Sequence, residues 1–231
     1  MDLQKRECPM EITTECGAGW GFMKIQYENL NLEFYNTNVY DRDFDDLLKT
    51  LYFLNPYFED DLWPNDLDKY PDKPMFEVVE YQKKNDIGFR YHAISSNFIW
   101  NEEPDISKWT ISRKATSPKE HAKNYSFDLI FHIEKYEESI DNKTEFDFQI
   151  KYNDFCYAVA KAFTQLIKKH GFYGYHQSTY NQDFNMRYFL SIKAIALNNF
   201  EALKIEDVKN EHVDGDSSSF EKELELLQFD M

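Results

Sequence analysis

The chain has 231 residues, an aromatic content of 17% and a formal net charge of −16, from 26 Lys and Arg against 42 Asp and Glu. This length supports a sizeable core, and the aromatic content is well above that of disordered chains. A negative field repels phosphate backbones and anionic lipid, so the charge excludes nucleic acid and membrane surfaces as expected partners and favours a basic protein.

The first 54 residues predict a turn, two strands and a helix. Residues 1–21 are read as irregular and end in the turn Gly17-Ala-Gly-Trp-Gly. Residues 22–34 alternate between apolar and polar side chains, which predicts two strands joined around Glu28-Asn29. Residues 41–54 predict a short helix whose apolar face holds Phe44, Leu47, Leu48 and Leu51.

The middle of the chain predicts a loop, a hairpin and a further strand. Four prolines between Pro56 and Pro74 break the chain into an acidic, aromatic loop. Alternation on both sides of residues 83–86 predicts a β-hairpin, and residues 97–100 continue as a third short strand. Residues 101–124 are polar with two prolines, and are expected to form a long surface loop.

From residue 125 onward the pattern predicts two strands and two main helices. Residues 125–133 and 144–150 alternate as strands do, and the period then changes to that of a helix near 153–170. Asn153 or Asp154 is expected to cap this helix, and Gly171 to end it in a left-handed conformation. Asp183 is expected to cap a second, well-buried helix near 184–198.

Together these elements predict an α+β fold. We expect an antiparallel, strongly twisted sheet of five to seven strands, with the two main helices packed on one face. Residues 1–200 form the expected single domain. Residues 201–231 are an expected acidic tail of net charge −7, in which Gly215-Asp-Ser-Ser-Ser is typical of a linker. Ser218 and Glu221 have capping-box spacing ahead of a short amphipathic helix.

Cys156, in the first turn of the helix near 153–170, is the strongest candidate nucleophile, because the helix dipole lowers a thiol pKa there. His132 or His170 would have to act as its base in a hydrolase or transferase. Nothing around Cys156 matches a cysteine-hydrolase signature, so packing in the core is the favoured interpretation. Neither Cys8 with Cys16 nor His170 with His176 has the spacing of a closed metal site, so no metal and no cofactor are predicted.

The acidic charge is concentrated in two segments. Residues 41–72 carry ten acids against three bases, and with the equally acidic tail they account for nearly all of the net charge. Aromatic side chains, the usual anchors of protein interfaces, are interleaved with these acids. The alternative is a solvated acidic loop whose aromatic side chains pack into the core. The predicted partner-binding residues are Asp43, Asp45, Asp46, Tyr57, Asp60, Asp61, Trp63 and Asp66.

The chain resembles the immunity proteins of bacterial polymorphic toxin systems. The resemblance lies in the acidic α+β character, in the helix that begins Tyr152-Asn-Asp-Phe-Cys-Tyr-Ala-Val, and in the Gly171-Phe-Tyr-Gly-Tyr that follows it. It implies a protein that binds a cognate toxin, often a basic nuclease, and blocks its active site. It transfers no individual functional residue to this chain.

The cytoplasm is the expected compartment. The N-terminal residues lack the apolar core of a signal peptide, and Cys8, Cys16 and Cys156 are odd in number and scattered, which favours reduced thiols. A regulatory or scaffold protein whose acidic tail docks elsewhere remains an alternative function, beside the hydrolase or transferase that would use Cys156.

Overall fold

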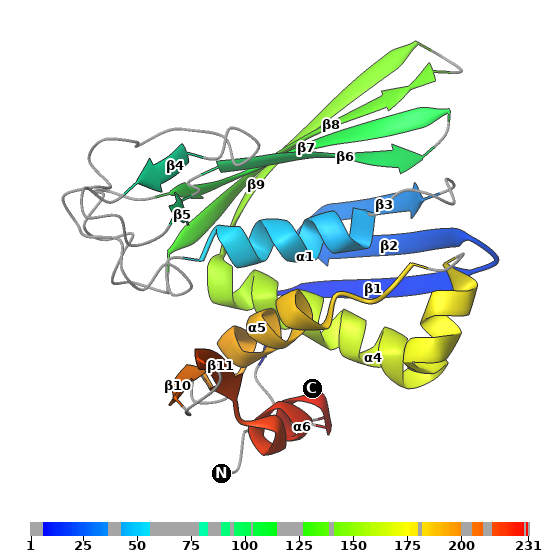
Figure 1. Cartoon of the computed structure of the whole chain (residues 1–231). Helices are drawn as coiled ribbons and strands as arrows, with labels where there is room; N and C mark the ends of the chain where they lie inside the picture. The colour runs from blue at the N-terminus through cyan, green and yellow to red at the C-terminus, as the bar shows by residue number, and fades with distance from the viewer. Residues whose placement is uncertain are drawn as a thin grey trace.

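The computed structural model describes residues 7–36, 43–55, 79–82, 89–92, 95–102, 104–114, 127–138, 141–179, 182–199, 205–209, 214–228 and 230. Its framework is α+β, with two antiparallel sheets in which each strand pairs with its neighbour in the chain (Figure 1). The three-stranded sheet consists of β1 (Met10–Gly17), β2 (Trp20–Tyr27) and β3 (Leu30–Asn36). The four-stranded sheet consists of β6 (Ser95–Glu102), β7 (Asp105–Lys114), β8 (Asp128–Glu137) and β9 (Asn142–Lys151).

Tight turns join the strands of the three-stranded sheet. Ala18 and Gly19 both adopt positive φ, 50° and 83°, between Gly17 and its partner Trp20. Two such residues give the turn whose twist matches that of an antiparallel hairpin. Glu28, with φ of 53°, lies in the connection between β2 and β3. The turns predicted at both places are confirmed, and so are β2 and β3.

The two sheets meet along β3 and β6 but do not share a backbone ladder. Side chains fill the junction instead, with Phe34 of β3 packed against Trp100 and Trp109 at ring distances of 5.8 and 4.7 Å. All three side chains are fully buried. The expected single sheet of five to seven strands is therefore replaced by two sheets that share one core.

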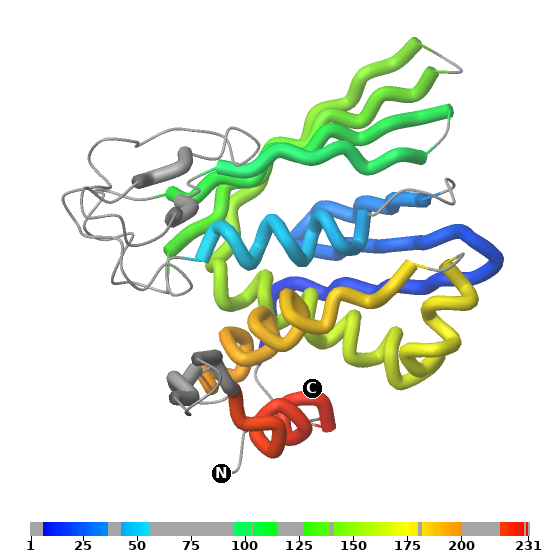
Figure 2. Tube along the Cα trace, viewed as in Figure 1, coloured from blue at the N-terminus to red at the C-terminus, as the bar shows by residue number. Residues whose placement is uncertain are grey.

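Four helices complete the main body: α1 (Asp43–Phe53), α4 (Tyr152–Ser178), α5 (Met186–Ala196) and α6 (Phe220–Gln228). Figure 2 shows the path of α4 along the three-stranded sheet, where it packs against β1, while α1 contacts both β6 and α5. Thr14 of β1 donates a hydrogen bond to the Ala162 carbonyl of α4 (3.2 Å), and Tyr152 of α4 donates one to the Leu51 carbonyl of α1 (2.8 Å).

Helix α4 is longer than predicted. Gly171 leaves helical geometry with the positive φ that was predicted, 66°, but its ψ of 167° is extended rather than left-handed helical, and the chain turns helical again and continues to Ser178. The predicted caps are also corrected. Lys151 stands at the N-cap of α4 without a side-chain cap, and Asn185, rather than Asp183, accepts the capping hydrogen bond from the Tyr188 N–H in α5.

Four of the described strands were missed from the sequence. Residues 10–17 form β1, although residues 1–21 were expected to be irregular, and residues 105–114 form β7 inside the expected loop. The predicted hairpin is confirmed as β4 (Val79–Gln82) paired with β5 (Phe89–His92). The stretch interpreted as a linker contributes to β11 (Asp214–Ser218), which pairs with β10 (Ile205–Lys209).

Helix α6 packs on α5 rather than standing apart from the domain. Leu226, 1% exposed, lies in an apolar cluster with Leu190, Ala194 and Leu197 of α5. The predicted amphipathic helix is confirmed, but its cap is Ser219, whose hydroxyl accepts from the Lys222 N–H (3.4 Å). Ser218 instead donates a hydrogen bond to Glu223 (2.5 Å).

Candidate partner-binding surface

Three of the predicted partner-binding residues, Asp43, Asp45 and Asp46, form the first turn of α1. Negative side chains stabilise this end of a helix, because the unpaired backbone N–H groups there carry partial positive charge. The helix dipole alone therefore accounts for acids at these positions. The remaining predicted residues, Tyr57, Asp60, Asp61, Trp63 and Asp66, lie outside the described residues.

The three aspartates of this turn have different surroundings. Asp43 is 2% exposed, and its Oδ2 accepts from the Asn101 N–H of β6 at 3.4 Å. Its carboxylate therefore ties α1 to the four-stranded sheet and is not free to meet a partner. Asp45 and Asp46 are partly exposed. They line two different cavities.

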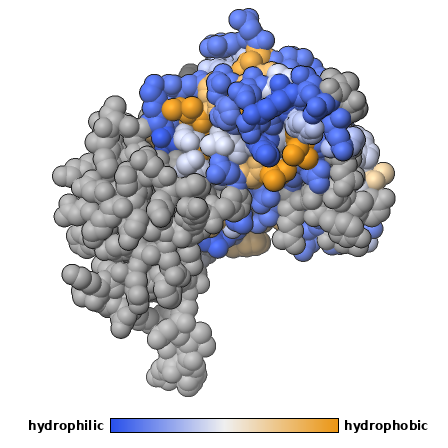
Figure 3. All heavy atoms as spheres, turned by 90° about the horizontal axis from the view of Figure 1, so that it is seen from above, coloured by the Kyte–Doolittle hydropathy of each residue, from blue (hydrophilic) through white to orange (hydrophobic). Residues whose placement is uncertain are grey.

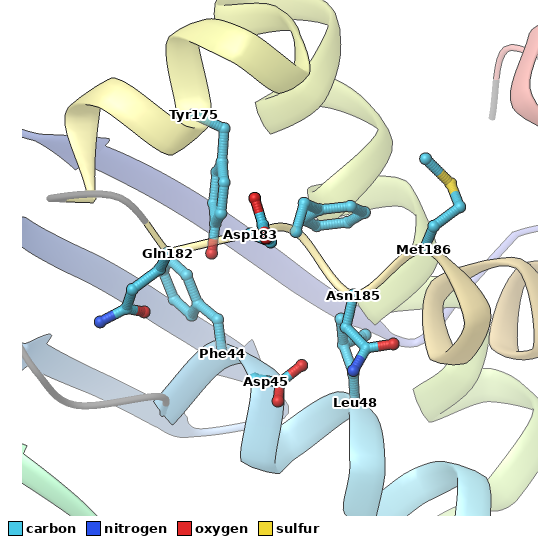
Figure 4. Close-up of a pocket in the computed structure, with 9 residues that line it drawn as sticks. Phe44, Asp45, Leu48, Tyr175, Gln182, Asp183, Asn185 and Met186 are labelled. Atoms are coloured by element: carbon cyan, nitrogen blue, oxygen red, sulfur yellow. The ribbon is translucent and has the colours of Figure 1, made fainter.

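Asp45 lies in a cavity of about 460 Å³ between α1, the end of α4 and the start of α5 (Figure 4). Phe44 and Leu48 of α1 share the lining with Asp45. Tyr175 of α4 and residues 182–186 form the opposite side. We call this cavity the α1 pocket. Its volume falls in the range of about 300–1,000 Å³ that is usual for ligand sites.

The α1 pocket is acidic. The Oδ1 atom of Asp45 is buried without a hydrogen-bond partner. Burial, chiefly, raises the pKa of Tyr175, and the negative charges of Cys16 and Asp45 raise it further. The Asp183 carboxylate, 95% exposed, pairs with His176 at 3.1 Å. The polar groups of this pocket are the Asp45 carboxylate, the Tyr175 phenol and the side-chain amides of Gln182 and Asn185, with the Asp183 carboxylate at the rim.

The outer face of the four-stranded sheet is the second candidate surface. Figure 3 shows the molecule from above the view of Figure 1, with hydrophilic residues predominating and apolar residues scattered among them. His132 pairs with Asp147 at 2.8 Å, and Lys143 forms ion pairs with Glu134 and Glu145. The hydrogen bond to Asp147 raises the pKa of His132. These charges largely neutralise one another, which is typical of a solvated sheet face.

Cys156 has no histidine beside it in the described structure. Cys156 is fully buried in α4, Cys16 is buried in β1, and neither forms a disulfide. His170 follows Cys156 by 14 residues on the same helix, a rise of about 21 Å. His132 points to the outer face of its sheet, whereas its neighbours Phe131 and Ile133 are buried. Neither proposed base can reach the thiol.

Among the described residues, no three His, Cys, Asp or Glu side chains gather where they could hold a metal ion. No helix of the described chain is both long and apolar enough to cross a membrane.

The comparisons with known proteins leave the site to be interpreted from its geometry. No family model matches the chain, and no curated protein and no solved structure is significantly similar to it.

Proposed function

We propose that the chain is an acidic protein-binding module that inhibits a basic protein partner, as an immunity protein neutralises a toxin. The observation that carries this proposal is the uneven distribution of charge. Residues 41–72 and 201–231 hold nearly all of the net charge of −16. Solubility alone needs no such localisation, whereas a localised field speeds and orients the approach of an oppositely charged partner.

The α1 pocket supports this function from the structural side. It lies at the N-terminal end of α1, just after the acidic segment begins at residue 41. In it, the Asp45 carboxylate has a buried oxygen without a hydrogen-bond partner among the described residues. The geometry around Cys156 gives no support to the alternative of a hydrolase or transferase. A basic protein is therefore the partner that we propose, with neither nucleic acid nor a membrane as a binding surface, and the cytoplasm as the compartment.

The experiment uses the product of the neighbouring reading frame in the source genome. We expect its expression to arrest growth of a bacterial host and co-expression of this chain to restore growth. The purified pair should bind with an affinity that falls as salt rises from about 0.05 M to about 0.5 M, since screening weakens charge attraction. If the product of the neighbouring reading frame neither arrests growth nor binds this chain, the proposal is contradicted.

A further inference from the structure

The α1 pocket combines a negative charge with aromatic walls. Asp45 supplies the charge from α1, and Phe44 and Phe184 supply rings from α1 and from the segment before α5. Phe184 is held in place by other rings, with Tyr175 at 5.3 Å and Phe189 at 5.1 Å, both edge-on. The cavity is preformed, and its lining combines these rings with the polar side chains of Asp45, Tyr175, Gln182, Asp183 and Asn185.

Tyr175 and Asp45 line the pocket with a hydroxyl and a carboxylate. Tyr175 is only 4% exposed, and in Figure 4 its hydroxyl points into the cavity. The buried Oδ1 of Asp45 makes no hydrogen bond among the described residues. Leaving buried acceptors unpaired is costly, so a ligand that brings several donors gains most from this site.

Two basic residues that adjoin the pocket lining in sequence, Arg187 and His176, are already engaged. The guanidinium of Arg187 lies over the Tyr52 ring at 5.2 Å and donates a hydrogen bond to the Tyr52 hydroxyl at 3.0 Å. His176 is paired with Asp183. Asp45 forms no ion pair among the described residues, so no basic side chain there neutralises its charge.

The ligand chemistry follows from these features. A guanidinium carries five N–H donors and no acceptor, which complements a carboxylate and a phenol oxygen. It is also planar and stacks on aromatic rings, and it is less strongly hydrated than an ammonium group. Arginine therefore fits the pocket better than lysine does, and anions are repelled from it.

We propose that the α1 pocket receives an arginine side chain of the partner protein, with the guanidinium between Asp45 and Tyr175 and against the rings of Phe44 and Phe184. This inference rests on the proposed function, because it assigns the site through which a basic partner is recognised. Arginine is among the residues that most often dominate protein interfaces, and a single anchored side chain can carry much of the binding energy.

The test titrates the full chain with Nα-acetyl-L-arginine amide, followed by NMR shifts of the Tyr175 and Phe184 rings. Nα-acetyl-L-citrulline amide, which has the same shape without the charge, is the matched probe. We expect the arginine amide to shift both rings and the citrulline amide to bind at least about tenfold more weakly, since the charge-assisted hydrogen bonds are lost. Free L-arginine should also bind more weakly, because its carboxylate meets an acidic surface.

Asp45→Asn should weaken binding of the arginine amide at least about tenfold, and Tyr175→Phe should weaken it by less. Asp46→Asn is the control, because it removes one charge from the same helical turn but lines a different cavity. Arg42→Ala tests the chain's own arginine that precedes α1 in sequence, and we expect unchanged affinity. A large gain in affinity would identify Arg42 as the natural occupant and overturn the proposal.

Other outcomes also decide the matter. Equal binding of the citrulline amide, equal effects of Asp45→Asn and Asp46→Asn, or no ring shifts would overturn the arginine pocket. Tighter binding of free L-arginine would assign the site to a free amino acid rather than to a partner. These probes need no partner protein, so the pocket and the proposed function fail separately. If the neighbouring gene product binds in a salt-dependent way but the arginine amide causes no ring shifts, the proposed function is supported and only the arginine pocket is overturned.

Discussion

Glu102 of β6 and Lys135 of β8 form a salt bridge of 3.1 Å within the four-stranded sheet, and both side chains also bind the backbone of β3 in the other sheet. Lys135 also donates to the Glu33 carbonyl of β3 at 2.6 Å, and Glu102 accepts from the Tyr35 N–H of β3 at 3.4 Å. Two backbone groups at a sheet edge are thus paired with side chains rather than with another strand. This pairing explains how β3 and β6 lie side by side without merging into one sheet.

Breaking this pair should destabilise the fold. The side chains of Glu102 and Lys135 are 6% and 21% exposed, so either single change leaves a poorly solvated charge beside the β3 edge. We expect Glu102→Gln or Lys135→Met each to lower the free energy of unfolding by about 2 kcal/mol. The double variant should lose much less free energy of unfolding than the two single variants lose together, because neither charge is then left without its partner. Urea denaturation measures this, and additive losses would contradict it.

Much of the fold could be predicted because apolar residues alternate with polar ones wherever one face of a strand is buried. The change of period at residues 150–155 located the junction of β9 and α4 within a few residues. β7 was missed because two of its inward-facing residues, Ser107 and Arg113, are polar although they are buried. Ser107 donates to Glu102, and Arg113 lies over the Phe127 ring at 5.7 Å. These partners come from other strands and segments, so periodicity could not reveal them.

The α1 pocket could be predicted only in part. The concentration of acids in residues 41–72 pointed to Asp45. Tyr175 was instead placed after the predicted end of the first main helix, and Phe184 at the start of the second. The kink at Gly171 and the capping of α5 by Asn185 bring these residues opposite α1. Sequence reasoning placed both features differently, because neither the second helical segment of α4 nor the true cap has a strong local signal.

The three cysteines should differ sharply in reactivity. Cys156 is fully buried, and burial, with a contribution from Glu15, raises the pKa of Cys16 to about 11. Cys8 is half-buried, and its thiol donates to the Asp154 carbonyl at 3.3 Å. At neutral pH we expect iodoacetamide to label Cys8 well before the other two, since only accessible thiolates react. Mass spectrometry of the native and urea-unfolded chains checks this. Labelling of native Cys156 as fast as a free-thiol peptide would revive the catalytic alternative.

The contact of α6 with α5 should depend on pH through Lys193. This lysine is fully buried and donates to the Leu227 carbonyl of α6 at 3.5 Å. Burial, chiefly, and Lys168 lower its pKa from 10.5 to about 8, while Asp230 opposes the shift. Between these two pH values the unfolded chain binds more protons than the folded one, so stability rises with pH.

Lys193→Met should remove this rise and stabilise the chain near neutral pH. The measurement is the urea midpoint at pH of about 7 and about 10, compared with the wild type to cancel other titrating groups. Lys161→Met is the control, because Lys161 is an exposed lysine of α4. An unchanged pH slope in Lys193→Met would show that Lys193 is not the group responsible.

The His132–Asp147 pair gives a second titration that can be measured directly. The hydrogen bond of 2.8 Å, reinforced by the charges of Asp147 and Glu134, raises the pKa of His132 above 6.5. Its contribution to stability is complete below 6.5 and disappears as the pH rises through the folded pKa. Asp147→Asn should return the His132 pKa towards 6.5, and Glu145→Gln should change it less. NMR titration of the imidazole tests this, and equal effects of the two variants would contradict it.

The acidic segment of residues 41–72 and the outer face of the four-stranded sheet can be distinguished as binding surfaces by neutralising two acids in each. We expect Asp60→Asn/Asp61→Asn to slow association with the neighbouring gene product and to flatten its salt dependence, because charges at an interface rim act mainly on the on-rate. Glu145→Gln/Asp147→Asn is the matched control on the outer sheet face, where the acids are already paired with Lys143 and His132. This control should bind as the wild type does.

Trp63→Ala should act differently from the charge variants, because a buried aromatic anchor controls dissociation. The expected loss is about 2 kcal/mol, observed as a faster off-rate with little change in the on-rate. Surface plasmon resonance separates the two rates, and circular dichroism checks that the fold is intact. If Trp63→Ala instead unfolds the chain while Asp60→Asn/Asp61→Asn binds normally, the aromatics of residues 41–72 belong to the core. A loss in Glu145→Gln/Asp147→Asn would then assign binding to the sheet face.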